Sequence, residues 1–305
     1  MDISVIICTY NPNLTRLDQT LLALQKQSMD PRLWELIIVD NNSSNSFDTY
    51  LDLNFFPNSS IIKQPKQGLT YARLKGFQEA KGAVIVMVDD DNILQHDYLQ
   101  KTIDLFKDRP QLGAAGGKSL PEFEDEAPAW LNDFYGNLAL RDLGEDTIIT
   151  RWENTYPNSA PIGAGMAIRK IALQAYVDAM ADDQNVITDR TDTSLSSGGD
   201  NEINIQILRS GWTLGYFPEL ALKHIIPKER MQVEYLARLL RDTNRSWVQL
   251  LEKYQISPWK KINKQTLRLR KLKAYLTYKA WKTEVHLIKW HGACGMLEGL
   301  VKKSL

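Results

Sequence analysis

Short hydrophobic runs alternate with amphipathic stretches through residues 3–89. Uninterrupted apolar runs of roughly four to eight residues are typical of strands that are buried on both faces of a parallel sheet. Such runs lie at residues 3–8, 34–40, 60–63 and 82–89. We therefore expect these segments to form strands of one mostly parallel sheet.

Helical periodicity fills the intervals between these runs. A helix is predicted over residues 13–27, where leucines share one face at Leu14, Leu17, Leu21 and Leu24. A second helix is predicted over residues 69–82, closed by Gly82. The order strand, helix, strand, strand, helix, strand favours an α/β fold, in which helices flank a mostly parallel sheet.

Polar residues gather where the predicted strands end, at residues 9–11, 40–44 and 89–92. In α/β folds, ligands bind at the carboxyl ends of the strands. The sequence contains neither the glycine-rich fingerprint of dinucleotide-binding folds nor a phosphate-binding loop ending in Gly-Lys-Ser/Thr. The predicted ligand is therefore held by carboxylates and amides.

Three consecutive carboxylates, Asp89, Asp90 and Asp91, end the fourth run. Two carboxylates about 6 Å apart repel by roughly 3 kcal/mol at an effective dielectric near 20. In an extended chain Asp89 and Asp91 lie on one side, where they suit Mg²⁺ or Mn²⁺ shared with a substrate's phosphates. The alternative is a solvated acidic turn, with Asp90 or Asp91 capping a helix over residues 93–106.

Composition and charge divide the chain in two. Its 305 residues are 43% hydrophobic, which is enough for a full core and a smaller additional body. The net charge of zero combines −13 over residues 1–222 with +13 over residues 223–305. We predict one domain over residues 1–225 and a basic, mainly helical region over residues 226–305.

Features of membrane insertion and of disulfide frameworks are missing from the sequence. It begins without a basic leader, and no apolar run approaches the ~18 residues that span a bilayer. These observations favour a cytoplasmic location. Cys8 and Cys294 are expected to be free thiols, because Cys8 lies in an apolar strand far from its only possible partner.

A set of ordered motifs over residues 3–224 resembles the inverting family-2 glycosyltransferases of the GT-A fold, which use nucleotide-sugar donors. The motifs are VIICTYN, IIVDNNSS, QGLTYARLKGFQEAKGAVIVMVDDDN, GAGMAIRK and SGGDNEINIQILRSGW. Each fragment alone is weak, but their ordered combination is specific. The resemblance implies a GT-A nucleotide-sugar-binding domain followed by a C-terminal helical extension.

The resemblance also implies which residues bind the nucleotide-sugar. These are Thr9, Tyr10, Asn11, Asp40, Asn42, Arg73, Asp89, Gly163, Ala164 and Gly165. Tyr10 would stack on the base, and Asp40 would accept a hydrogen bond from the base edge; a turn-forming role is the alternative for Asp40. Arg73 would contact a phosphate or the base, or else lie on a solvated helix face. Gly163 to Gly165 would line the donor sugar, or serve only in strand-to-turn packing.

For the metal, the resemblance implies Asp89 and Asp91, with Asp91 the direct ligand and Asp89 nearer the ribose or a metal-bound water. His224 would be a further ligand or a structural histidine. The cofactor would be Mn²⁺ or Mg²⁺.

For catalysis, the resemblance implies Asp200 as the base that takes a proton from the acceptor hydroxyl. Around Asp200 the sequence reads Gly-Asp-x-Glu, where the family has Glu-Asp. The alternative role of Asp200 is that of a simple helix cap. Glu202 would orient the acceptor, brace the loop or be solvated. Trp130, in an acidic and aromatic stretch, would contact the acceptor sugar or belong to the core.

The basic region carries many cations between Leu, Tyr and Trp residues, with little Gly or Pro over residues 264–290. This pattern favours an amphipathic helix on an anionic membrane surface, at the inner face of the cell membrane. A helical face that packs on the acidic domain or on a second protomer is an alternative. Nucleic-acid binding competes, but the sugar-transfer motifs upstream disfavour it.

Together these interpretations predict a metal-dependent transferase. It would move a sugar, from a donor that is best a UDP-sugar, to a glycan or lipid-linked acceptor with inversion, in polysaccharide or surface-glycan synthesis. The alternatives are a non-catalytic nucleotide- or glycan-binding module and a nucleotidyltransferase. A nucleotidyltransferase would need a glycine-rich loop after the first strand, and residues 8–16 are not such a loop.

Overall fold

The computed structural model describes residues 1–180 and 198–302. The chain divides into two compact units, which are described separately below. Of the described residues, the first unit comprises 1–122, 139–180 and 200–225, and the second comprises 123–138, 198–199 and 226–302.

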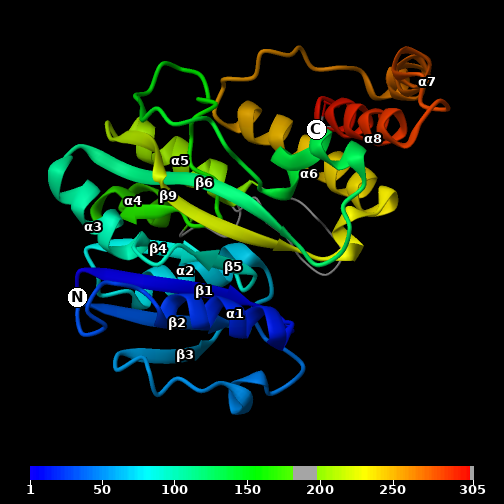
Figure 1. The fold of residues 1–305 in the computed structure, drawn as a ribbon. Coiled ribbons are helices and arrows are strands. Elements are labelled where there is room, and N and C mark those ends of the chain that lie inside the picture. The colour runs from blue at the N-terminus through cyan, green and yellow to red at the C-terminus, as the bar shows by residue number, and fades with distance from the viewer. Residues whose placement is uncertain (181–197, 303–305) are drawn as a thin grey trace. The chain divides into compact units, whose positions relative to one another are not determined.

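The first unit is built on a mixed sheet with the strand order β3-β2-β1-β4-β8-β6-β9-β5, with β7 added to β9 (Figure 1). The strands are β1 (Ile3–Thr9), β2 (Trp34–Asp40), β3 (Ser59–Lys63), β4 (Val84–Val88), β5 (Asn92–Leu94), β6 (Leu112–Phe123), β7 (Ile148–Thr150), β8 (Ala167–Arg169) and β9 (Thr213–Ile226). The helices of this unit are α1 (Leu14–Gln25), α2 (Leu69–Glu79), α3 (Tyr98–Asp108), α4 (Lys170–Ala179) and α5 (Gly199–Arg209), with a 3₁₀ turn η1 (Phe47–Tyr50).

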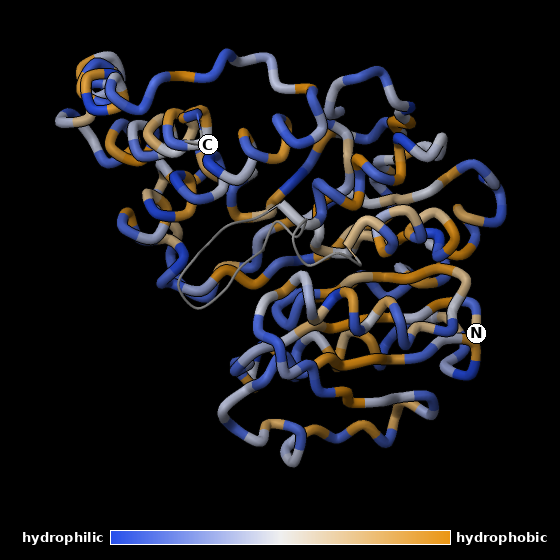
Figure 2. The backbone as a smooth tube through the Cα atoms, turned by 180° about the vertical axis from the view of Figure 1, so that it is seen from behind, coloured by the Kyte–Doolittle hydropathy of each residue, from blue (hydrophilic) through white to orange (hydrophobic). Residues whose placement is uncertain are grey.

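The four predicted hydrophobic runs form the parallel part of this sheet. β1 pairs in parallel with both β2 and β4, and β2 pairs in parallel with β3. Figure 2, in which the chain is coloured by residue hydropathy, shows hydrophobic residues along these strands. β1, β2 and β4 are buried on both faces, which explains why their runs are continuous rather than alternating. β3, at the edge of the sheet, is only partly buried.

Successive side chains of β1 enter two different cores. Val5 packs with Ile7 and with residues of α1 and α3 in one hydrophobic cluster. Ile6 packs with residues of α2, α4 and α5 in another. Because strand side chains alternate in direction, α1 and α3 cover one face of the sheet and α2, α4 and α5 cover the other. This arrangement confirms the predicted α/β fold class.

Antiparallel strands extend the sheet beyond β4, and one of them corrects a prediction. We expected a helix directly after the three aspartates, but residues 92–94 form the short strand β5, and α3 begins only at Tyr98. β5 pairs with β9, so that Asn92 lies opposite His224. This pairing with a distant strand overrides the local helical pattern at residues 93–97, and the rest of the predicted helix forms as α3.

The second unit is mainly helical. It contains α6 (Val233–Lys253), α7 (Leu267–Tyr278) and α8 (Glu284–Gly299), with the 3₁₀ segments η2 (Ala129–Leu138), η4 (Lys228–Met231) and η5 (Lys264–Thr266). The sequence suggested one amphipathic helix over residues 264–290, but α7 and α8 are separate. Lys279, in the left-handed conformation with φ +50°, ends α7.

Helices α6 and α8 pack closely because α8 presents glycines to α6. A Cβ added at Gly295 would lie 2.0 Å from the carbonyl oxygen of Arg241, and one added at Gly299 would lie 2.9 Å from that of Arg245. Glycine therefore lets the two helix backbones approach each other.

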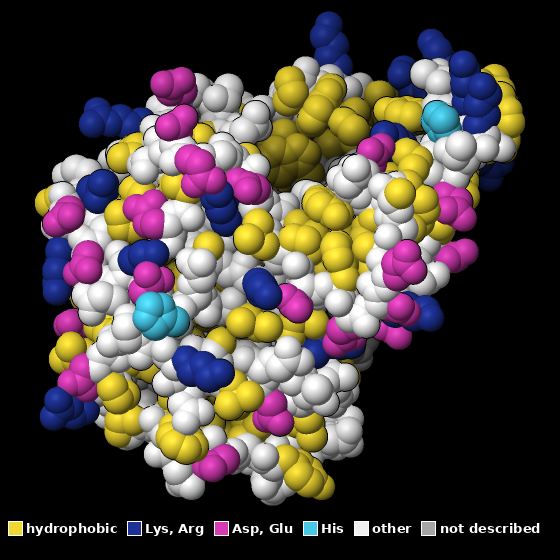
Figure 3. Space-filling model, viewed as in Figure 1, with side chains coloured by type: hydrophobic (Ala, Val, Ile, Leu, Met, Phe, Trp, Pro, Cys, Tyr) yellow, Lys and Arg dark blue, Asp and Glu magenta, His cyan; other side chains and the backbone are white. Residues whose placement is uncertain are grey.

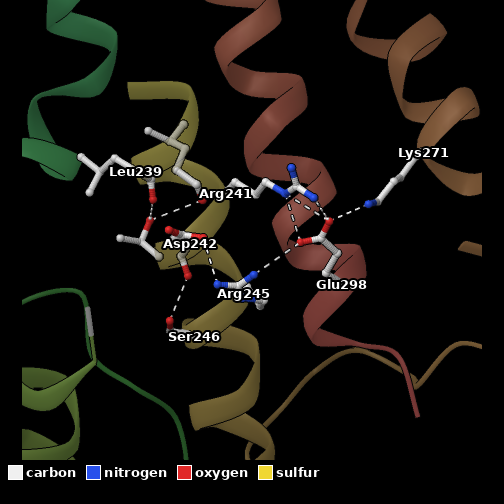
Figure 4. Close-up of polar contacts among 9 residues, drawn as sticks. Leu239, Arg241, Asp242, Arg245, Ser246, Lys271 and Glu298 are labelled. Carbon is white, nitrogen blue, oxygen red and sulfur yellow. Dashed lines mark hydrogen bonds and ion pairs between the residues drawn. The ribbon is translucent and has the colours of Figure 1, made fainter. Parts of the chain in front are cut away.

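An ion-pair network joins all three helices around Glu298 (Figure 4). Both carboxylate oxygens of Glu298 accept hydrogen bonds from Arg241, at 2.5–3.1 Å, and Lys271 of α7 lies 2.5 Å from Oε1. Burial raises the pKa of Glu298, but the hydrogen bonds from Arg241 and Lys271 outweigh it and leave the pKa below its ordinary value. Glu298 is therefore a charged anchor that holds α7 on α8.

Among the described helices, we find none with the length and hydrophobicity needed to cross a bilayer.

We predict that Gly295→Ala lowers the free energy of unfolding by about 1–3 kcal/mol, because the new methyl group meets backbone that cannot move without separating α6 from α8. Gly136→Ala is the matched control in the same unit, since a Cβ there has nothing within 4 Å. Urea unfolding of both variants measures the difference. Equal stabilities would contradict the close packing of α6 and α8.

Candidate active site

The carboxyl ends of β1, β2 and β4 bring the predicted polar residues together (Figure 1). Thr9, the last residue of β1, is in register with Asp40, the last residue of β2. On the other side of β1, Ile7 is in register with Val88, directly before the aspartates. The Thr9 hydroxyl donates a hydrogen bond to a carboxylate oxygen of Asp90. Asp90, which the sequence analysis considered only as a helix cap, therefore fixes the end of β4 to the end of β1.

The loops after β1 and β2 are tied to each other. The side-chain oxygen of Asn11 accepts hydrogen bonds from Ser44, and the backbone N–H of Asn11 donates to the Ser43 hydroxyl at 2.9 Å. Asn11 and Asn42 both have positive φ, at +46° and +65°, a conformation that Asn tolerates well. Tyr10, at the start of the loop after β1, is exposed.

Asp40 has the turn-forming contact that we considered as an alternative, because its Oδ1 accepts a hydrogen bond from the Ser43 N–H at 2.8 Å. This contact fixes the carboxylate at the strand end.

Asn41 is a structural residue that the sequence analysis missed. Its side-chain amide donates to the carbonyl oxygens of Gln64 and Lys66, at 3.2 and 2.9 Å, and its Oδ1 accepts from the Gly68 N–H at 2.8 Å. Asn41 thereby ties the end of β2 to the segment that leads into α2. Only its place beside Asn42, in a strand-end turn, hinted at this role.

The three aspartates form a turn rather than an extended strand, which corrects the predicted alternation. The Asn92 N–H donates to the Asp89 carbonyl oxygen at 3.1 Å, and the Asp89 N–H donates back to the side-chain oxygen of Asn92 at 3.1 Å. The side-chain amide of Asn92 also donates to Asp91 Oδ1 at 3.2 Å. Asn92, which the sequence analysis did not single out, is fully buried and sets this turn.

Asp91 and His224 meet through the pairing of β5 with β9. The Ile225 N–H donates to the Asp91 carbonyl oxygen at 2.9 Å, and His224 Nε2 lies 3.2 Å from Asp91 Oδ1. Both side chains are about 5% exposed. The sequence analysis named both residues, but it had no means of placing them side by side.

The chemistry of this pair fits a divalent cation. Two neighbouring ligands of an octahedral ion with bonds of about 2.1 Å are separated by roughly 3 Å, close to the distance between Asp91 and His224. One carboxylate and one imidazole leave the other positions for phosphate oxygens and water. Among the described residues no cluster of three or more Asp, Glu, His or Cys side chains is arranged to hold a metal, so the protein would supply only part of the coordination.

Arg73 is a buried cation of this site, only 7% exposed, which excludes the solvated helix face. A Cβ at Gly163 would lie 2.9 Å from its guanidinium. Burial raises the pKa of the nearby Cys8 thiol to about 12, against the opposing effect of Arg73 and with a further rise from Asp89 and Asp90. Arg73, Asp89 and Asp90 are therefore all close enough to the Cys8 thiol to change its pKa.

The buried segment Gly163, Ala164 and Gly165 requires glycine at its ends. Gly165 has φ +73°, and a Cβ there would lie 2.8 Å from the Tyr98 hydroxyl, which donates to the Gly165 carbonyl oxygen at 2.5 Å. The Gly163 N–H donates to Asp200 Oδ2 at 3.0 Å. This segment therefore approaches the predicted base directly.

Asp200 lies in the first turn of α5, as predicted, with its other oxygen accepting from the Asn201 N–H at 3.0 Å. Tyr156 and Asn204, which the sequence analysis missed, support this turn. The Tyr156 hydroxyl donates to the Asn201 side chain at 2.5 Å and accepts from the Asn204 amide at 3.1 Å. Burial, reinforced by the charge of Asp200, raises the pKa of Tyr156, which therefore stays a hydrogen-bond donor.

The two residues predicted to contact the acceptor have different surroundings. Glu202 is on α5 and only 1% exposed, so it is not a solvated helix residue. Trp130 belongs to η2 of the second unit, where it packs edge-to-face on Phe134 with ring centroids 6.1 Å apart.

The model of glycosyl transferase family 2 matches residues 4–176, more than half of the chain. The chain therefore belongs to the family-2 glycosyltransferases, and the family that its ordered motifs predicted is confirmed. Crystal structures of S. aureus TarS 1–349 resemble it with a TM-score of 0.56 at 13% identity, covering 98% of this chain and 90% of that one. This likeness bears on the fold alone, and it confirms the GT-A architecture.

Two named relatives each match part of the chain. Glucosyl-dolichyl phosphate glucuronosyltransferase of Haloferax volcanii is 26% identical over 161 residues, which are 51% of this chain and 50% of that protein. Dolichol-phosphate mannosyltransferase of Pyrococcus furiosus is 32% identical over 117 residues, which are 35% of this chain and 30% of that protein. The chain thus spans half or less of the length of these relatives.

We predict that Asn41→Ala lowers the free energy of unfolding by about 2–4 kcal/mol, because it leaves three backbone groups without their partner. Asn42→Gly is the matched control, since glycine adopts the positive φ of that exposed neighbour without strain. Chemical denaturation of the two variants tests this, and a loss below about 1 kcal/mol for Asn41→Ala would show that Asn41 does not hold the strand end.

Proposed function

We propose that this chain transfers a sugar from a nucleoside-diphosphate sugar to a glycan or lipid-linked acceptor, with inversion and with a divalent cation. The observation that carries the proposal is the buried pair Asp91 and His224 in the same unit as Arg73 and Asp200, whose side chains both lie against Gly163. A diphosphate donor needs cationic partners, and an inverting transfer needs a base; these residues supply both.

The proposed donor is a UDP-sugar. S. aureus TarS 1–349, which has the same fold, was crystallised with UDP-GlcNAc. In this chain Tyr10 is exposed for stacking on a base, and the second oxygen of Asp40 remains for a hydrogen bond to the base edge. Thr9, Asn11 and Asn42 lie in or beside the loops after β1 and β2, which carry Tyr10 and follow Asp40.

Asp91 and His224 would hold Mn²⁺ or Mg²⁺ together with the donor diphosphate, with Asp89 nearer the ribose. Such a cation neutralises the charge of the leaving diphosphate. Arg73 adds a fixed positive charge in the same buried region, which is worth more than an exposed one because the surroundings are less polarisable.

Asp200 is the proposed base. Its carboxylate accepts from two backbone N–H groups, which hold it in place. The acceptor hydroxyl would give its proton to Asp200 as its oxygen attacks the anomeric carbon opposite the leaving group. The Gly163–Gly165 backbone would lie against the donor sugar, and Glu202 would brace the helix turn that carries the base.

A glycan or lipid-linked acceptor, in polysaccharide or surface-glycan synthesis at the inner face of the cell membrane, is proposed for two reasons. The names of both archaeal relatives refer to dolichol-linked phosphates. Residues 223–305 carry a net charge of +13, as expected of a region that meets anionic lipid. Trp130 remains a candidate for contact with the acceptor.

A non-catalytic nucleotide-binding module is the competing function. It would bind UDP but would not release UDP from any donor, so turnover separates the two functions.

For the metal we predict that Mn²⁺ with UDP raises the melting temperature of the wild type, and that Asp91→Asn and His224→Gln abolish the metal-dependent part. The reason is that each variant removes one of the two ligands. Donor turnover should fall by roughly 100- to 1000-fold in each. His96→Gln, at an exposed turn, is the matched control. Metal-dependent stabilisation that survives in both ligand variants would place the cation elsewhere.

For the base we predict that Asp200→Asn reduces sugar transfer by about 100- to 10,000-fold but leaves UDP binding intact, because the amide oxygen can still accept from Gly163. Asp104→Asn, on the exposed side of α3, should behave as the wild type. Donor turnover and UDP calorimetry are the measurements. Full activity of Asp200→Asn, or a product that retains the donor's anomeric configuration, would exclude the proposed inverting mechanism.

A further inference from the structure

We propose that α7 docks on an anionic lipid surface through a leucine stripe, defined as Leu269, Leu272 and Leu276, and through the cations that flank it. This inference deepens the proposed function, because it names the part of the chain that would meet the membrane of a lipid-linked acceptor. It rests on observations within the second unit alone.

The leucine stripe is exposed on one side of α7. Leu269, Leu272 and Leu276 are 70%, 57% and 57% exposed. Their spacing of three and four residues places them on one face of the helix. Removing a single leucine side chain from water favours the buried state by roughly 10- to 150-fold. Three exposed leucines in a row therefore form a surface with a strong tendency to be covered.

A different side of α7 is already occupied by α8. Tyr275 packs edge-to-face on Trp290 with ring centroids 5.2 Å apart, and the Trp290 indole N–H donates to the Lys271 carbonyl oxygen at 3.2 Å. Lys271 is paired with Glu298. The contacts with α8 thus hold the helix so that the leucine stripe faces away from it.

Cations surround the stripe and carboxylates do not. Residues 259–283 contain nine Lys and Arg residues and no Asp or Glu. Lys261 and Lys271 are paired, with Glu252 and Glu298. Seven others are exposed and have no ion pair within the part of the chain that the structure describes: Lys260, Lys264, Arg268, Arg270, Lys273, Lys279 and Lys282. In the space-filling view, Lys, Arg and hydrophobic side chains lie together over α7, at the upper right (Figure 3).

Aromatic side chains lie at the end of the helix. Tyr278 is 40% exposed and Trp281 is 55% exposed. Tyr and Trp rings favour the boundary between lipid headgroups and hydrocarbon. Leucines on one face, cations beside them and Trp at the end are the features of a helix that lies in the plane of a membrane surface.

Lipid fits this face better than the other possible occupants. A second copy of the chain would bring two sets of seven exposed cations together, because a twofold contact pairs a surface with itself. A nucleic acid would satisfy the cations but would leave the leucine stripe in water. An anionic bilayer satisfies both, since each Lys or Arg near its surface contributes about a fivefold gain in binding.

The test is sedimentation of the full chain with vesicles of phosphatidylcholine alone, or of a three-to-one mixture of phosphatidylcholine and phosphatidylglycerol. The wild type should bind the mixed vesicles, and it should bind the neutral ones at least 10-fold more weakly. The variant Leu269→Gln, Leu272→Gln, Leu276→Gln should bind mixed vesicles at least 10-fold more weakly than the wild type. Glutamine preserves helix propensity, so the helix remains.

Two further variants complete the comparison. Lys273→Gln, Lys279→Gln, Lys282→Gln should reduce binding to mixed vesicles by about 100-fold, from three factors of about five. Leu22→Gln, Leu33→Gln is the matched control, because these leucines are 50% and 47% exposed on the first unit; it should bind as the wild type does.

The proposal is overturned if the wild type does not bind mixed vesicles, or if the leucine variant binds them unchanged. It is also overturned if the wild type dimerises in the absence of lipid and the leucine variant does not, since the stripe would then be a protein interface. Donor turnover in lipid-free solution is measured separately and should be the same in the leucine variant and the wild type. Loss of turnover in every protein with intact vesicle binding would refute the proposed function and leave the docking face standing.

Discussion

The antiparallel pairing of β5 with β9 is the constraint on which the candidate active site depends. It sets Asn92 opposite His224, and so places Asp91, the preceding residue, with its carboxylate 3.2 Å from the imidazole. A shift of one residue in this register would turn His224 to the other face of the sheet. Three residues of β5 thus decide whether two ligands more than a hundred positions apart can share one ion.

The acidic turn is held by separate contacts to each of its residues. Thr9 donates to the Asp90 carboxylate and the Asn92 amide donates to the Asp91 carboxylate, while the Asn92 side-chain oxygen accepts from the Asp89 backbone N–H. These contacts hold the turn and two of its carboxylates in place before a ligand arrives, so little reorganisation is needed when a cation and a diphosphate bind. The parallel strands β1, β2 and β4 place the aspartates at one edge of the sheet, and the antiparallel strand β9 brings His224 to Asp91.

The sequence predicted those strands and helices that depend on the hydrophobic pattern of their own residues. The four hydrophobic runs became β1 to β4, and Asp200 lies in the first turn of α5, as expected. The sequence could not predict β5 or the turn before it, because both exist only through contact with β9. The supporting role of Tyr156 could not be predicted either, because it depends on a contact with Asn201, which is distant in the sequence. The break at Lys279 was missed because no glycine or proline marks it.

The most direct test of the account is anomalous diffraction from crystals grown with Mn²⁺ and UDP. The account predicts a manganese peak within about 2.3 Å of a carboxylate oxygen of Asp91 and of His224 Nε2, with diphosphate oxygens completing the coordination. A UDP molecule bound at the strand ends with no manganese beside Asp91 would contradict it. So would a manganese peak held by other side chains.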